Sequence, residues 1–73
     1  MAQKLTITNS IRRLRFDAVE MTQKALADQV GVTRQTIVAI ENAKYYPTLE
    51  LAFLIARVFE KEISDVFSIE LKE

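Results

Sequence analysis

Cysteine and histidine are absent from this sequence, and glycine and proline occur only once each. Without cysteine the chain can form neither disulfides nor thiolate metal sites. So few turn-forming residues favour short helices. The longest unbroken apolar run, residues 51–56, is far too short to cross a membrane, and the first residues contain no apolar run typical of a signal peptide. We therefore expect a soluble cytoplasmic protein, with no cofactor and no small-molecule ligand.

The composition suits one small folded unit. Of the 73 residues, 49% are hydrophobic, which is enough for a single core. We expect one domain spanning residues 1–73. A core of this size gives little spare stability, so further burial of surface by dimerisation would be unsurprising.

Charges are unevenly distributed along a chain whose net charge is zero. Residues 1–48 carry seven bases and four acids, whereas residues 49–73 carry three bases and six acids. The zero net charge argues against nucleic acid as a partner, but the basic amino-terminal part favours it. Such an asymmetry also arises by chance in a short chain, so charge alone leaves the partner open.

The most informative stretch is TQKALADQVGVTRQTIVAIE, which predicts two short helices joined by a tight turn. Thr22 and Thr33 each precede an apolar-periodic segment, as helix N-caps do. Gly31 stands just past the first segment, where a left-handed conformation is easy only for glycine. The stretch therefore predicts a helix-turn-helix unit over residues 22–41.

Three further helices are predicted around this unit, each from a capping residue and the segment that follows it. Their caps and ends are Asn9 or Ser10 to 17–19, Thr48 to about Phe59, and Ser64 to Val66. The expected fold class is all-α with five helices.

Residues 4–8 and 67–72 alternate between apolar and polar side chains. A period of two is typical of β-strands. The two segments either pair as a small antiparallel ribbon or remain frayed tails, and the alternation alone does not decide between them.

The predicted third helix has an apolar face and a face free for a partner. At about 100° per residue, Ile37 and Ile40 point toward the core. Gln35 and Ala39 lie on the opposite side, and Arg34 projects from the helix start. Glutamine can bind adenine, arginine can bind guanine, and alanine can contact the methyl group of thymine. Each is also an ordinary surface residue, so only the joint pattern points to base reading.

Three stretches carry a resemblance that covers residues 11–67: MTQKALADQVGVTRQTI, IEN-x-K-Y-x-P-T-L-E-L-A and IARVFEKEISDVF. They resemble the Xre/Cro/C1-type helix-turn-helix family, the five-helix domain of phage lambda-like repressors. The chain is most similar to the family's small stand-alone bacterial regulators, whose third helix begins with the same RQTI. The resemblance implies a sequence-specific regulator that binds double-stranded DNA.

The resemblance also implies which residues touch DNA. Base edges face the positions of Arg34, Gln35 and Ala39. The sugar–phosphate backbone is contacted from the second helix, the third helix and the loop after it, by Gln23, Thr33, Thr36, Asn42, Lys44 and Tyr45. The family often pairs an arginine of the first helix with the glutamate that closes the third, and these positions are Arg15 and Glu41 here.

Two positions depart from the family pattern. Ala43 stands where relatives often have glycine between the third and fourth helices, and Val19 stands where they have glycine before the second helix. If position 43 requires a positive φ, alanine is strained by about 1 kcal/mol or more. Otherwise the loop takes another path and moves Asn42 and Lys44. At Val19 we expect either strain or a reshaped turn.

The leading hypothesis is a homodimeric repressor that reads a palindromic operator, with half-sites about 10 bp apart or a multiple of that. The resemblance implies dimerisation through the carboxyl-terminal part of the chain. The candidates for that surface are the exposed residues among Phe59, Ile63, Val66, Phe67 and Ile69.

Two other classes of function compete with it. A protein-interaction module would keep the fold without binding DNA, and the zero net charge favours it, whereas Gln23, Arg34 and Lys44 argue for DNA. An enzyme would have to use acids, lysines or hydroxyls, and no pair of acids stands at metal-ligand or acid–base spacing on an inward face. We therefore expect no enzymatic activity. The sequence does not separate a chromosomal regulator from a phage repressor or an antitoxin.

Overall fold

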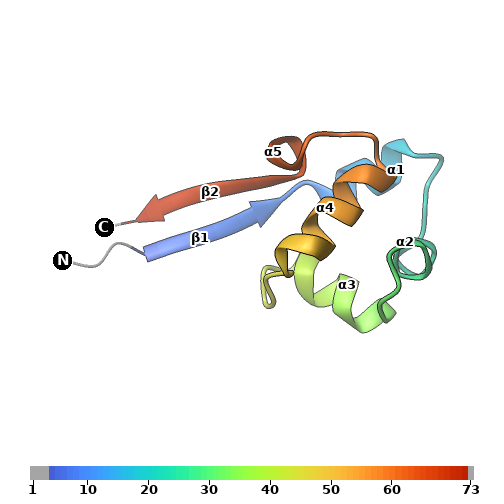
Figure 1. Cartoon of the computed structure of the whole chain (residues 1–73), viewed down its shortest axis with the longest axis horizontal. Coiled ribbons are helices and arrows are strands. Elements are labelled where there is room, and N and C mark those ends of the chain that lie inside the picture. The colour runs from blue at the N-terminus through green and yellow to red at the C-terminus, as the bar shows by residue number, and fades with distance from the viewer. Residues whose placement is uncertain (1–3, 73) are drawn as a thin grey trace.

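The computed structural model describes residues 4–72, which form five helices and two strands. In chain order these are β1 (Lys4–Asn9), α1 (Ile11–Asp17), α2 (Gln23–Val30), α3 (Arg34–Glu41), α4 (Leu49–Val58), α5 (Ile63–Val66) and β2 (Phe67–Lys72). A two-stranded ribbon projects from the helices, and the molecule measures 43 × 21 × 19 Å along its principal axes (Figure 1). The five-helix prediction is confirmed. Within the described part of the chain, no helix is long and apolar enough to cross a membrane.

The ribbon joins the two ends of the described chain. β1 and β2 are antiparallel, with Leu5 opposite Leu71 and Ile7 opposite Ile69. Because opposed residues share a face of a ribbon, these four side chains make one face apolar, and the threonines, Ser68 and Glu70 occupy the other. Of the two alternatives that the sequence left open, the structure therefore has the ribbon and not the frayed tails.

The three threonine caps form as predicted. The Oγ1 atoms of Thr22, Thr33 and Thr48 accept a backbone N–H three residues further on, at 3.0, 3.2 and 3.2 Å respectively. Gly31 follows α2 with a φ of 77°, and its N–H donates back to the carbonyl of Ala27. These contacts fix the end of α2 and the start of α3, so the turn between them is short and defined.

The first helix is held by the earlier of its two predicted caps. Ser10 precedes α1, but its side chain makes no capping hydrogen bond. The Asn9 Oδ1 atom instead accepts the N–H of Ile11 at 3.2 Å. The Ser10 N–H donates to the carbonyl of Val66 at 2.9 Å, which ties the start of α1 to α5.

The predicted Ser64 cap is wrong, because the last helix starts earlier. α5 begins at Ile63, with Glu62 in the cap position. The N–H of Glu62 donates to the Oδ2 atom of Asp65 at 3.3 Å, as the third residue of a capping box does. The carboxylate of Asp65, rather than the hydroxyl of Ser64, therefore sets the helix start.

All five helices contribute to the core. The largest fully buried side chains are Ile11, Leu26, Ile37, Ile40, Ile55 and Val66. Val66 is only 1% exposed, so it is not one of the exposed residues that the predicted dimer surface would use. Phe59, Ile63 and Phe67 are partly buried against this core, and among the five candidates only Ile69 is exposed, at 67%.

Both positions that lack the family's glycine have a left-handed backbone. The φ angle is 57° at Ala43 and 56° at Val19. The loop after α3 therefore keeps a path that requires positive φ, at a cost of about 1–2 kcal/mol for a non-glycine residue. Val19 is 96% exposed, so no packing compensates this branched side chain.

Replacing Ala43 by glycine is expected to raise the free energy of unfolding by about 0.5–1 kcal/mol. Relief of the left-handed strain exceeds the entropy that glycine adds to the unfolded chain. Urea denaturation at a fixed protein concentration measures the change. The matched control is Ala39→Gly inside α3, which should instead lose about 1 kcal/mol. A loss of stability for Ala43→Gly would contradict the assignment of strain.

Candidate nucleic-acid interface

The third helix presents a polar start and a half-exposed flank to solvent. Ile37 and Ile40 are buried beneath it, at 0% and 1% exposure. Arg34 and Gln35 are exposed in its first turn, and Ala39 is half-buried one turn further on. The three residues predicted to read bases therefore lie away from the core, on a helix whose opposite side is buried in it.

Two threonines close the first turn of α3. Besides accepting the N–H of Thr36, the Thr33 hydroxyl lies 3.0 Å from the Thr36 hydroxyl. A hydroxyl has one hydrogen to donate, so this pair consumes one hydrogen and leaves the other available. That remaining hydrogen can be donated to an acceptor such as a phosphate oxygen.

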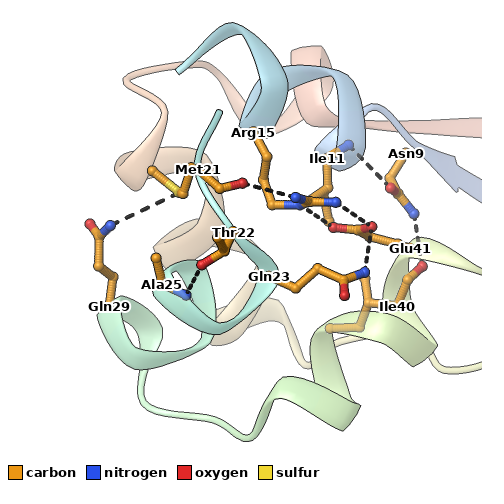
Figure 2. A network of polar contacts seen from close by, with 10 residues as sticks. All are labelled: Asn9, Ile11, Arg15, Met21, Thr22, Gln23, Ala25, Gln29, Ile40 and Glu41. Carbon is orange, nitrogen blue, oxygen red and sulfur yellow. Dashed lines mark hydrogen bonds and ion pairs between the residues drawn. The ribbon is translucent and has the colours of Figure 1, made fainter. Parts of the chain in front are cut away.

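An ion pair joins the end of α3 to α1 (Figure 2). The Nε and Nη2 atoms of Arg15 donate to the two carboxylate oxygens of Glu41 at 2.7 and 3.1 Å. The Nη1 atom of Arg15 donates to the carbonyl of Met21 at 2.9 Å. The side chains of Arg15 and Glu41 are only 14% and 7% exposed. The pairing that the family resemblance implied is present, in a bidentate geometry.

Gln23 belongs to the same network. Its Nε2 atom donates to the Oε1 atom of Glu41 at 3.1 Å (Figure 2), so the first residue of α2 is linked to the last residue of α3. The sequence interpretation assigned Gln23 to a DNA phosphate and missed this internal contact. The amide keeps a second N–H beyond the bond to Glu41.

Asn9 connects the ribbon to α3, a role that the sequence interpretation did not give it. Its Nδ2 atom donates to the carbonyl of Ile40 at 2.9 Å, while its Oδ1 atom accepts from Ile11 (Figure 2). The Tyr46 hydroxyl accepts the N–H of Ile7 from β1 at 3.3 Å. The only available signal was an asparagine at the junction of strand and helix, which reads equally well as a simple cap.

The first residues of the loop after α3 form a tight turn that is hydrogen-bonded back to the helix. The N–H groups of Ala43 and Lys44 donate to the carbonyls of Ile40 and Ala39 at 3.0 and 2.9 Å. The side chains of Asn42, Lys44 and Tyr45 are exposed on this turn. The three loop residues predicted to contact the DNA backbone are therefore held next to the carboxyl-terminal end of α3.

Comparison with known proteins shows which family the helix-turn-helix unit belongs to. A helix-turn-helix family model, HTH_3, matches residues 11–66. An HTH-type transcriptional regulator of Archaeoglobus fulgidus is 53% identical over 53 residues, covering 73% of this chain and 75% of the relative. The regulator MJ0272 of Methanocaldococcus jannaschii is 54% identical over 50 residues, covering 68% and 76% respectively. The regulator YgzD of Bacillus subtilis is 42% identical over 62 residues, covering 85% and 92%. The chain therefore belongs to the Xre/lambda repressor-like helix-turn-helix family of transcriptional regulators.

Proposed function

We propose that this protein is a repressor that binds double-stranded DNA as a homodimer and reads a palindromic operator with α3. The orientation of α3 is the observation that carries the proposal. Ile37 and Ile40 are buried, whereas Arg34 and Gln35 are exposed at the helix start. The ion pair of Arg15 with Glu41 restrains the end of α3, and base reading depends on such rigid support.

Arg34, Gln35 and Ala39 are the proposed base readers. An arginine binds the O6 and N7 atoms of guanine, and a glutamine binds the N6 and N7 atoms of adenine. Ala39 is four residues after Gln35 and so lies on the same side of the helix. Its small side chain suits contact with the methyl group of thymine.

The proposed contacts to the DNA backbone come from three segments of the chain around these base readers. They are Gln23 from α2, Thr33 and Thr36 from the start of α3, and Asn42, Lys44 and Tyr45 from the following loop. Such contacts fix the position and orientation of the helix in the groove but carry no sequence information. The free hydroxyl hydrogen of the threonine pair, the second N–H of Gln23 and the exposed ammonium of Lys44 support this assignment.

An exposed apolar face on the ribbon supports the homodimer. Leu5, Ile69 and Leu71 share this face and are 50%, 67% and 60% exposed. A two-stranded ribbon is marginally stable by itself, and β1 and β2 project beyond the helices (Figure 1). A second copy of the chain would cover it.

An apolar groove of about 490 Å³ between the ribbon and α4 is continuous with this face, since Ile7 and Ile69 line it. Its lining includes Ile7, Leu49 and Phe67. In a dimer with two-fold symmetry, the apolar face of each copy can pack against the groove of the other, so the face and the groove are buried in both copies. The same axis supplies two reading helices, which a palindromic operator requires.

Replacing Arg34 by alanine is expected to reduce binding to the selected operator about tenfold to a hundredfold, with little effect on random duplex. Lys44→Ala should weaken all duplexes alike and lower the salt slope by about 1. The operator is first selected from a random duplex library with the purified protein. Titrations at several salt concentrations then measure both variants, and a reporter with the operator in its promoter should show lower expression with the wild-type protein only.

Two results would count against the proposal. Equal losses on operator and random duplex for Arg34→Ala would exclude Arg34 as a base reader. Wild-type protein that binds no duplex in a salt-dependent manner would favour the protein-interaction module, which the zero net charge also suits.

A further inference from the structure

A polar cleft of about 560 Å³ opens between α1, the start of α2 and both ends of α3. Its lining includes Gln23 and Asn42, two of the proposed backbone contacts, and Arg34, a proposed base reader. It also includes Arg12 of α1, to which no role has been given. The cleft therefore brings a first-helix residue to the proposed DNA surface.

The positive charges in this cleft are not equivalent. The guanidinium of Arg15 is occupied by Glu41 at 2.7 Å, and the ammonium of Lys24 is 3.1 Å from Asp28. Among residues 4–72, no salt bridge is formed by Arg12 or by Arg34. Arg12 and Arg34 are thus the two lining cations whose charge is available to an external anion.

The helical positions of the neighbouring arginines explain why Arg12 is available. Arg12 precedes Arg15 by three residues, nearly one helical turn, and so lies on the same side of α1. Arg13 is rotated by about 100° from it and pairs with Asp17 at 3.8 Å. α1 therefore presents one free guanidinium at the cleft and one partly neutralised guanidinium beside it.

We infer that Arg12 binds a backbone phosphate of the DNA at this cleft, between the contacts of Gln23 and Asn42. The inference rests on the proposed DNA binding and extends its contact surface to the first helix. A guanidinium is well suited to a phosphodiester because its fork of N–H groups matches two phosphate oxygens. The contact positions the protein on the duplex and does not distinguish base sequences.

Arg12→Ala is expected to weaken binding about tenfold on operator and random duplex alike, as for the loss of one charged hydrogen bond. The slope of log affinity against log salt should fall by about 0.9, the value for one phosphate contact. The matched control is Arg13→Ala, which removes the same charge from the adjacent position and should change the slope much less. Arg12→Lys should restore most of the slope.

The outcomes separate this inference from the proposed function. If Arg12→Ala and Arg13→Ala change the slope equally, with the wild-type protein binding DNA normally, Arg12 makes no specific contact and only this inference is wrong. If the wild-type protein shows no salt-dependent binding, the proposed function fails and the inference fails with it. Circular dichroism should show the same melting temperature for both alanine variants, since both side chains are exposed.

Discussion

Replacing Glu41 by alanine is expected to lower the free energy of unfolding by about 3–5 kcal/mol. The carboxylate accepts three hydrogen bonds, two from Arg15 and one from Gln23. Its loss would leave the guanidinium of Arg15, only 14% exposed, without a counter-charge. A domain of this size has only a few kcal/mol of stability in total, so the variant should be largely unfolded at physiological temperature. Urea denaturation at fixed protein concentration measures the loss.

A double substitution distinguishes a missing partner from a missing side chain. Arg15→Met combined with Glu41→Leu removes both charges and keeps apolar volume, so most of the lost stability should return. The matched control is Asp28→Ala, which breaks the exposed pair with Lys24 and should cost about 0.5 kcal/mol or less. A loss for Glu41→Ala as small as that of Asp28→Ala would show that the ion pair does not stabilise the fold.

Replacing Ile69 by threonine is expected to weaken the proposed dimer about 30- to 1,000-fold. Each copy would lose about 1–2 kcal/mol of apolar burial, and the substitution is present in both copies at a two-fold interface. The resulting 2–4 kcal/mol corresponds to that range of dissociation constants. Threonine is also β-branched, so the strand should persist. Sedimentation velocity over a concentration series measures the dissociation constant.

Glu70→Thr is the matched control, because it changes the next residue of β2 to the same amino acid on the opposite face of the ribbon. It should leave the dimer intact. Binding to a single half-site should survive Ile69→Thr, whereas tight binding to the full palindrome should be lost. A monomeric wild-type protein at micromolar concentration, or equal effects of both substitutions, would exclude this dimer surface.

The parts of the fold that depend on neighbouring residues were predictable from the sequence. Thr22, Thr33 and Gly31 define the helix-turn-helix unit through hydrogen bonds and a backbone angle within a few residues of each. The last helix was placed incorrectly because two neighbouring residues, Ser64 and Asp65, both suit a helix start. The carboxylate reaching back to the N–H of Glu62 decides between them, and the sequence pattern alone does not rank the two.

Contacts between distant residues could not be derived from local patterns. The alternation in residues 4–8 and 67–72 is the same whether or not the segments pair, so only the structure shows the ribbon. The pair of Arg15 and Glu41 was expected through family resemblance alone, because nothing in their 26-residue separation indicates a contact. The contact of Asn9 with Ile40 was not expected at all.

In the proposed dimer, that contact of Asn9 would couple the spacing of the two operator half-sites to the ribbon. The Asn9 side chain accepts the N–H of Ile11 at the start of α1 and donates to the carbonyl of Ile40 in α3, so it ties the end of β1 to α3. In the proposed dimer, the ribbons would then determine the distance between the two copies of α3. Changes in spacing between half-sites would have to be accommodated at this joint or by bending the DNA, and loosening Asn9 would widen the range of spacings tolerated without altering which bases are read.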